Sequence, residues 1–218
     1  MKQNIIIFGS SSEIGNSLKI LINEKGYITH TISRSDSTEL NHLKVTNYIK
    51  DIELIKSFIK NIEKPQVIFF NGYLAENRND YEPTFNEISQ TDYVNFQIPY
   101  FLTNEINKSL HVTKFIYIST IASIKPRLKN YIYGLSKLKL EKSLKFLNLR
   151  SFLIIKFGKV ETKMSKNHKS PPFTITSEKA ASIIYKKLGK TGVVMANYKI
   201  LLSKIVLIVF PQKFINRF

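Results

Sequence analysis

The sequence predicts an α/β fold in which a doubly wound parallel sheet is covered by helices on both faces. Strand-like and helix-like segments alternate from the first residues onward, as in repeated strand–helix–strand units. Two strands are uninterrupted apolar runs, Ile5 to Phe8 and Val67 to Phe70, which is typical of strands buried on both faces. The chain has 218 residues, of which 43% are hydrophobic, so we expect one domain with a sizeable core.

The individual elements follow from the same alternation. We expect strands at 4–8, 27–33, 42–45, 67–70, 114–119, 152–157 and 193–195, and helices near 13–25, 48–61, 87–110, 131–147 and 177–188. No internal repeat or flexible linker interrupts this series, and the proline-containing segment 165–172 is predicted to be a loop. Residues 1–196 are therefore expected to form a single domain, followed by an apolar and basic tail at 197–218.

The turn after the first strand indicates a dinucleotide site of the Rossmann type. It runs from Gly9 to Gly15 and leads directly into a helix. Glycine lets the backbone approach a pyrophosphate, and the helix N-terminus offers amide donors for its charge, to which serine hydroxyls add more. The predicted cofactor contacts in this turn are Gly9, Ser11, Ser12, Glu13, Ile14 and Gly15.

Arg34 indicates which dinucleotide the site binds. It follows the second strand, where such folds place the residue that faces the adenosine ribose. An acidic residue there would accept hydrogen bonds from the 2′-hydroxyl, whereas a guanidinium suits a 2′-phosphate. Asp36 lies two residues too late for the acidic role, unless the loop brings it back. The sequence thus favours NADP(H), with a solvated Arg34 as the alternative interpretation.

Tyr133 and Lys137 are candidates for acid/base chemistry. They are four residues apart on a predicted helix, so their side chains emerge on one face. A neighbouring ammonium would lower the pKa of a phenol toward a value useful for giving a proton to a carbonyl oxygen. The helix follows the strand that ends at Ser119, at the sheet edge where doubly wound folds place their sites.

Taken in order, these motifs resemble the short-chain dehydrogenase/reductase family over almost the whole chain. The resemblance rests on the glycine turn, Asn71, Asn95, the Ser119-Thr120 pair, Tyr133-x-x-x-Lys137 and Gly158-x-Val160-x-Thr162. It implies that Tyr133 is the general acid/base, that Lys137 lowers its pKa and holds the nicotinamide ribose, and that Asn95 supports a proton-relay water. It also implies cofactor contacts for Asn71, Val160 and Thr162. The hydroxyl that orients the substrate carbonyl is Thr120 by its spacing from the tyrosine, or Ser119 beside it.

Composition excludes several other kinds of site. The chain has no cysteine, which rules out disulfides, thiolate metal sites and cysteine nucleophiles, and its four scattered histidines give no basis for a metal site. The net charge is +17, and residues 110–218 alone carry +19. The positive charge of the second half suits an anionic partner. The alternative interpretation is that these basic side chains are ordinary solvated surface groups. Nucleic acid is disfavoured because no recognition motif accompanies it.

The tail suggests a membrane surface. The apolar run Ile200 to Phe210 is too short to span a bilayer but suits an anionic lipid surface, and Ile200, Leu201, Ile205, Ile208 and Val209 are predicted to form one helical stripe. Packing of this stripe on the domain or on a second subunit is the alternative. Within the family, the second half is most similar to ketoreductase subunits that act in decaprenylphosphoryl-ribose epimerisation.

That similarity implies reduction of a keto-sugar on a polyprenyl phosphate, with a soluble keto compound as the alternative substrate. A dinucleotide-binding module without catalysis is the rival from another functional class. We expect a cytoplasmic homo-oligomer, peripheral at the inner face of the membrane, with Ser165 to Phe173 as a lid and Lys163, Lys166 and Lys169 as candidates for a phosphate contact.

Overall fold

A seven-stranded parallel sheet forms the centre of the computed structural model, which describes residues 3–75, 82–166 and 170–216. The strand order is β3-β2-β1-β4-β5-β6-β7, and every neighbouring pair is parallel. The strands are β1 (Asn4–Phe8), β2 (Ile28–Ser33), β3 (His42–Lys44), β4 (Gln66–Phe69), β5 (Lys114–Thr120), β6 (Phe152–Phe157) and β7 (Gly192–Met195). The predicted doubly wound sheet is confirmed, and its order reverses between β1 and β4, where such folds bind ligands.

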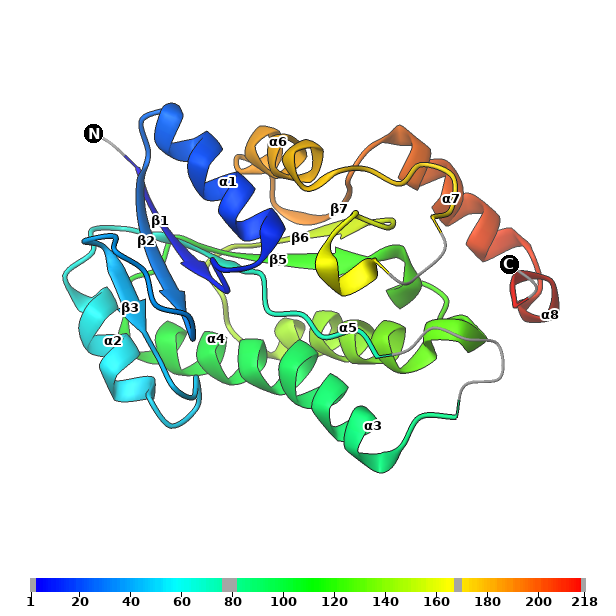
Figure 1. Ribbon diagram of the computed structural model, residues 1–218, viewed down its shortest axis with the longest axis horizontal. Coiled ribbons are helices and arrows are strands. Elements are labelled where there is room, and N and C mark those ends of the chain that lie inside the picture. Colours follow the sequence, from blue (N-terminus) through cyan, green and yellow to red (C-terminus); the bar gives the residue numbers. More distant parts are fainter. Residues whose placement is uncertain (1–2, 76–81, 167–169, 217–218) are drawn as a thin grey trace.

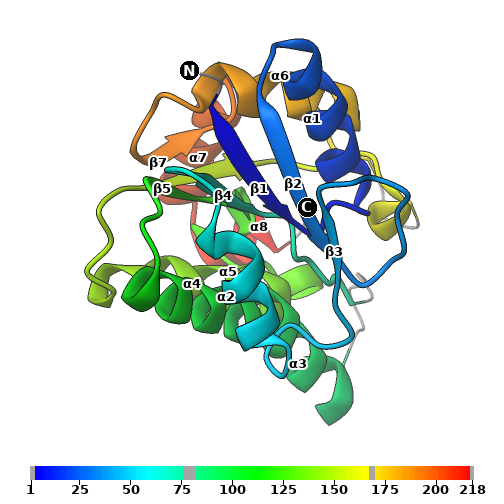
Figure 2. The same cartoon turned by 90° about the vertical axis from the view of Figure 1, so that its left-hand side faces the viewer.

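Helices cover both faces of this sheet (Figures 1 and 2). They are α1 (Glu13–Glu24), α2 (Ile52–Lys60), α3 (Phe85–Asp92), α4 (Ile98–Ser109), α5 (Tyr131–Ser143), α6 (Ser177–Lys187), α7 (Tyr198–Val209) and α8 (Gln212–Ile215). An apolar cluster that includes Leu18 and Ile184 joins α1 and α6 to one face. A second cluster, which includes Ile55, Leu102 and Leu140, joins α2, α4 and α5 to the other. The two clusters sandwich the apolar strands predicted to be buried on both sides.

The helix predicted at 48–61 begins only at Ile52, because a separate turn precedes it. The Asp51 carboxylate accepts hydrogen bonds from the backbone N–H groups of Thr46 and Asn47. The Asn47 amide oxygen accepts from the N–H groups of the two residues after Tyr48. Side-chain acceptors of this kind compete with a helix for the backbone donors. Tyr48 is therefore released from the helix and buried beneath the sheet.

The helix predicted at 87–110 is three consecutive segments. α3 is followed by a π-helical turn, η1 (Tyr93–Gln97), and then by α4. Pro99 has no N–H to give to the carbonyl of Asn95 four residues earlier, and the N–H of Ile98 bonds instead to the carbonyl of Tyr93. The proline thus widens the helix at Asn95, which was selected from the sequence as a candidate site residue.

The tail leaves the last strand as α7 and α8 and runs along one end of the molecule (Figure 1). Ile200 and Ile215 are buried against the domain. α8 is tied to the loop before α5, since Gln212 donates to the carbonyl of Pro126 and the N–H of Leu128 donates to Asn216. None of the helices in the described residues has the length and apolar character needed to cross a bilayer.

Candidate active site

The turn between β1 and α1 forms a narrow backbone cradle. Gly9 has a φ of +75°, which favours glycine, and a methyl group on Gly15 would lie 2.9 Å from the Gly9 carbonyl oxygen. The Ser12 hydroxyl accepts a hydrogen bond from the N–H of Gly15 and caps α1. The two predicted glycines are thus required sterically, and the first turn of α1 points its amides at the sheet edge.

The other predicted residues of this turn face different ways. Ser11 is exposed at the surface, whereas Ile14 packs into the apolar cluster beneath α1 and α6. The Glu13 carboxylate reaches across to the segment after β6 and accepts a hydrogen bond of 2.5 Å from the N–H of Lys163. The structure therefore brings Glu13 to the site edge as a link between two loops.

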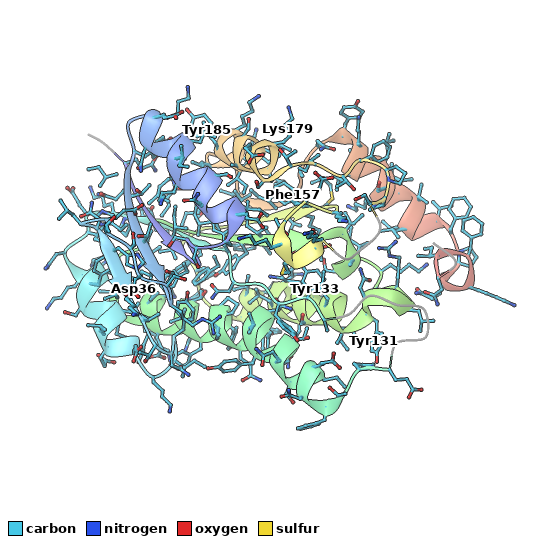
Figure 3. All side chains as sticks on the ribbon, viewed as in Figure 1. Asp36, Tyr131, Tyr133, Phe157, Lys179 and Tyr185 are labelled. Carbon is cyan, nitrogen blue, oxygen red and sulfur yellow. The ribbon has the colours of Figure 1, made fainter. Side chains whose placement is uncertain are left out.

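Arg34 lies exposed at the carboxyl end of β2, as expected from the sequence. Asp36 forms an ion pair with Lys44, at 2.7 Å, and so has a partner other than a ribose hydroxyl. Figure 3 shows Asp36 on the β2–β3 side of the molecule, well apart from Tyr133. The Arg34 charge acts on Tyr48: burial raises the pKa of Tyr48, and the Arg34 charge and the Asn71 side chain oppose this rise. Sequence reasoning missed Tyr48 as a neighbour of Arg34 and Asn71 because it placed the residue in a helix.

Asn71 sits one residue beyond the end of the apolar β4 run and carries an unsatisfied polar atom. Its Oδ1 is buried and has no hydrogen-bond partner among the described residues. Its backbone carbonyl accepts a hydrogen bond of 3.1 Å from Lys137 Nζ. A buried acceptor without a partner is costly, so it points to a ligand donor at this position.

α5 presses against the end of β5 at Gly134. A methyl group there would lie 2.6 Å from the Ala122 carbonyl oxygen, in the 3₁₀ turn η2 (Ile121–Ser123), so only glycine allows this approach. The contact brings Tyr133 to the segment that contains Thr120. Lys137, one turn further along α5, is only 5% exposed, and its Nζ lies 6.0 Å from the centre of the Tyr133 ring.

The protonation of this pair differs from the sequence-based expectation. Burial raises the pKa of Tyr133 to about 12, instead of the ammonium lowering it. Burial also lowers the pKa of Lys137 to about 8, against an opposing effect of the Glu141 charge. The reason is that Lys137 Nζ is aimed at the Asn71 carbonyl, not at the phenol, and that both groups are out of water.

The two candidate hydroxyls at the end of β5 have different partners. Ser119 Oγ donates to the Glu141 carboxylate at 2.5 Å. Thr120 Oγ1 accepts from the N–H of Ala122, and no hydrogen bond among the described residues uses its proton. The geometry therefore leaves Thr120 able to donate to a further acceptor, whereas the Ser119 proton is already engaged.

Asn95 is fully buried, and its side chain is taken up by neighbouring groups. Its Oδ1 accepts from the N–H of Tyr73, and its Nδ2 donates to the Tyr73 carbonyl and to Ser136 Oγ. These bonds join the chain after β4 to α5. In this structure the amide works as a clamp between the segments that carry Asn71 and Tyr133.

The segment after β6 forms the opposite wall. Val160 pairs with Ile175, its carbonyl accepts from Ser165 Oγ, and Thr162 begins the short turn η5 (Lys163–Ser165). A pocket of about 380 Å³ opens here; it is lined by Glu13, Lys159, Glu161, Thr162, Lys163, Ser165, Lys166 and Ser170. The phosphate candidates Lys163 and Lys166 share this pocket, while Lys169 lies outside the described residues. The structure thus brings Glu13 and Thr162, predicted from distant motifs, to one pocket.

Sequence reasoning missed a buried ion pair behind the site. Lys156 Nζ lies 2.6 Å from Glu141 Oε2, and the two side chains are only 7% and 12% exposed. The signal was available in the strand Phe152–Phe157, which has a single lysine among apolar residues: a charge in such a strand requires a buried partner.

Comparison with solved structures establishes the fold. A short-chain dehydrogenase from Burkholderia cenocepacia in complex with NADP superposes with a TM-score of 0.76 at 14% identity, over 99% of this chain and 97% of that one. An alcohol dehydrogenase from Thermococcus sibiricus complexed with 5-hydroxy-NADP gives 0.74 at 15% identity, covering 89% and 96%. The ligand-free aldohexose dehydrogenase of Thermoplasma acidophilum gives 0.72 at 14%, covering 91% and 94%. No protein-family profile and no curated protein matches the sequence. The chain therefore shares the fold of short-chain dehydrogenases.

Proposed function

We propose that the protein is an NADPH-dependent ketoreductase of the short-chain dehydrogenase/reductase family. The observation that carries the proposal is the convergence of Tyr133, Lys137, Asn71 and Thr120 at the carboxyl edge of the sheet, beside the glycine turn. Structures of the same fold that contain NADP support the cofactor, and their shared architecture supports the family.

The residues present fit a dinucleotide. The backbone cradle of Gly9 and Gly15 and the capped start of α1 suit a pyrophosphate, and the unpartnered Asn71 Oδ1 suits a hydrogen-bond donor of the cofactor. Exposed Arg34 suits a 2′-phosphate, and the pairing of Asp36 with Lys44 removes the competing carboxylate. In this proposal Val160 and Thr162 hold the nicotinamide end. When bound, NADPH supplies a hydride.

The chain's own groups supply the proton and orient the ketone. With a pKa of about 12, Tyr133 holds its proton at neutral pH, which is the form needed to give it to a developing alkoxide. Thr120 donates a hydrogen bond to the same oxygen and polarises the carbonyl. Lys137, with a pKa of about 8, is mostly an ammonium at neutral pH, and in this proposal it holds the nicotinamide ribose beside Asn71.

NADPH oxidation with a panel of ketones tests this proposal. Tyr133→Phe is expected to abolish turnover and leave NADPH binding unchanged, while the control Tyr131→Phe, on the same helix, retains turnover.

Arg34→Ala is expected to weaken NADPH binding about ten-fold relative to NADH, the effect of one lost charge-assisted pair. Turnover that persists in Tyr133→Phe refutes the mechanism. If the wild type binds neither nucleotide, the proposal of an NADPH-dependent reductase is refuted, and a function without a dinucleotide becomes the one to test.

For the substrate, we propose a keto-sugar linked to a polyprenyl phosphate and approached from an anionic membrane surface. α7 and α8 expose apolar side chains: Leu201, Leu202, Ile205, Val206, Ile208, Val209, Phe210 and Phe214 are each at least 40% exposed. No acidic residue follows Glu178, whereas eight basic residues do. Two copies of this surface would repel one another, so an anionic lipid surface is the partner whose charge complements it.

Vesicle sedimentation tests the membrane contact. The wild type should bind vesicles that contain phosphatidylglycerol and not pure phosphatidylcholine, and added salt should weaken binding. Leu201→Ser/Val209→Ser should reduce binding, whereas Leu40→Ser, an exposed leucine on the β2–β3 loop, should not. A wild type that ignores both vesicles refutes the membrane contact, and a soluble keto compound becomes the substrate to test.

We also propose a homo-oligomer formed through the helices that bear Asn95 and Tyr133. Exposed Leu135 on α5 and Ile88 on α3 support an interface on this face. Light scattering that reports a monomer refutes it.

A further inference from the structure

Behind the proposed catalytic groups, one carboxylate gathers donors from three elements. Glu141, on α5, accepts hydrogen bonds from Ser119 Oγ on β5 and lies 2.8 Å from Ser123 Oγ in η2. Its other oxygen lies 2.6 Å from Lys156 Nζ on β6. Lys156 also donates to Ser123 Oγ at 2.7 Å. A buried ion pair that satisfies this many groups fixes all of them at once.

Thr120 lies between the two serines that this pair holds. Ser119 immediately precedes it, and Ser123 Oγ lies 2.7 Å from the Thr120 carbonyl oxygen. The backbone around Thr120 is thus held on both sides, while its own hydroxyl proton has no acceptor among the described residues. A hydroxyl held in this way is preorganised for a further acceptor.

Glu141 also lies on the same face of α5 as the proposed catalytic pair. Tyr133, Lys137 and Glu141 follow one another at intervals of four residues, so they form one row along the helix. Among the described residues around Lys137, the charged and titratable groups include Tyr133 and Glu141 on α5, Lys156 on β6 and Tyr73 after β4. The segment after β4, the end of β5 and η1 contribute the uncharged Asn71, Thr120 and Asn95.

We propose that Glu141 and Lys156 are positioning residues for the proposed reaction: the pair holds the Ser119–Ser123 segment around Thr120 and sets the charge balance next to Lys137. This inference rests on the proposed function for its catalytic consequence, but its electrostatic part does not. The negative member lies one turn from Lys137 on α5 and its charge acts on Lys137, whereas the positive member pairs with it from β6.

Two single substitutions break the same ion pair and should act on Lys137 in opposite directions. Lys156→Met leaves the Glu141 charge uncompensated, which favours the ammonium and raises the pKa of Lys137. Glu141→Gln leaves only the Lys156 charge, which lowers it. The double variant Glu141→Gln/Lys156→Met restores neutrality and should return the titration toward the wild type. A pair that only stabilises the fold would give no such opposite shifts.

The titration is measured by NMR on protein labelled at the lysine ¹³Cε position, with the Lys137 signal identified by its loss in Lys137→Arg. Shifts of about one pH unit in opposite directions are expected, as for a neighbouring charge gained or lost. Shifts in the same direction, or none, overturn the proposal. The measurement uses no substrate, so a protein that lacks reductase activity would refute the proposed function and still give this result.

The positioning part is tested by Ser119→Ala, which removes one donor to Glu141 and leaves no charge unpaired. Ser119→Ala can also be measured if a variant that removes one charge of the ion pair does not fold. The expected result is a lower kcat for ketone reduction with unchanged NADPH affinity, and Lys156→Arg, which keeps the charge, should retain kcat. An unchanged kcat in Ser119→Ala overturns this part.

Discussion

Helices α5 and α7 both reverse the usual distribution of polar and apolar side chains. α5 buries charge, since Lys137 is 5% exposed and Glu141 is in contact with buried Lys156. α7 does the opposite and exposes six of its large apolar side chains to solvent. A buried ammonium and an exposed apolar helix are each unfavourable for an isolated folded chain.

The two helices differ in what compensates the unfavourable free energy of the buried charges on α5 and of the exposed apolar side chains on α7. Inside α5, the compensation is internal: the Asn71 carbonyl, two serines and an ion pair surround the buried charges. On α7 and α8, Ile200 and Ile215 are buried and a few hydrogen bonds link the segment to the loop before α5, but the apolar side chains on the outer face of α7 stay exposed. The buried charges of α5 are thus satisfied within the chain, whereas the exposed apolar face of α7 is of the kind that partner surfaces cover.

The largest expected effect separates the anchored and the exposed face of α7. Ile200 is 4% exposed and packs against Gly158, so Ile200→Ala should lower the free energy of unfolding by about 3 kcal/mol. Leu201, the next residue, is 46% exposed, and Leu201→Ala should change it by less than about 0.5 kcal/mol. Urea denaturation of both variants measures the difference. Equal losses would show that the outer face of α7 is buried in solution.

An intermediate effect is expected where α5 meets η2. Gly134→Ala places a methyl group 2.6 Å from the Ala122 carbonyl oxygen, which forces α5 away from β5 and should cost about 2 kcal/mol. It should also reduce ketone turnover, because Tyr133 moves with the helix. Gly189→Ala is the matched control, since nothing lies within 4 Å of the added methyl. The prediction fails if both variants have the same midpoint of urea unfolding and the same ketone turnover.

The sequence was sufficient for those features that depend on local pattern. β1 and β6 were predicted with their observed ends, because an apolar run bounded by turn residues defines a buried strand. The glycine turn and the Tyr133–Lys137 spacing were likewise readable, since each motif lies within one strand–helix unit. Their convergence follows from the sheet order alone.

What the sequence did not predict depends on contacts between distant segments. The widened turn at Asn95 needs Pro99 and the clamp to Tyr73, and the protonation of Lys137 depends on burial that no spacing reveals. The predicted stripe on α7 was split for the same reason. Ile200 is buried against Gly158 of the domain, while Leu201, Ile205, Ile208 and Val209 are exposed.

The smallest expected effect concerns the cost of burying the Lys137 ammonium. The folded-state pKa of about 8 is below the ordinary value of 10.5, so the folded protein binds this proton less tightly than the unfolded chain. The cost is complete below pH 8 and disappears as the pH rises toward 10.5. Lys137→Met avoids it and should raise the free energy of unfolding by about 1 kcal/mol at pH 7, after the loss of the bond to Asn71.

The order of stability should therefore reverse as the pH approaches 10.5, because the wild type then loses its burial cost while Lys137→Met still lacks the bond to Asn71; Lys137→Met should have lost ketone turnover at every pH. Thermal unfolding between pH 6.5 and 10.5 measures this reversal. Lys139→Met is the control, because Lys139 is exposed and pairs with Asp92 at the surface. A constant stability difference across this range would show that the folded protein and the unfolded chain bind the Lys137 proton equally tightly, and it would refute a burial cost for this ammonium.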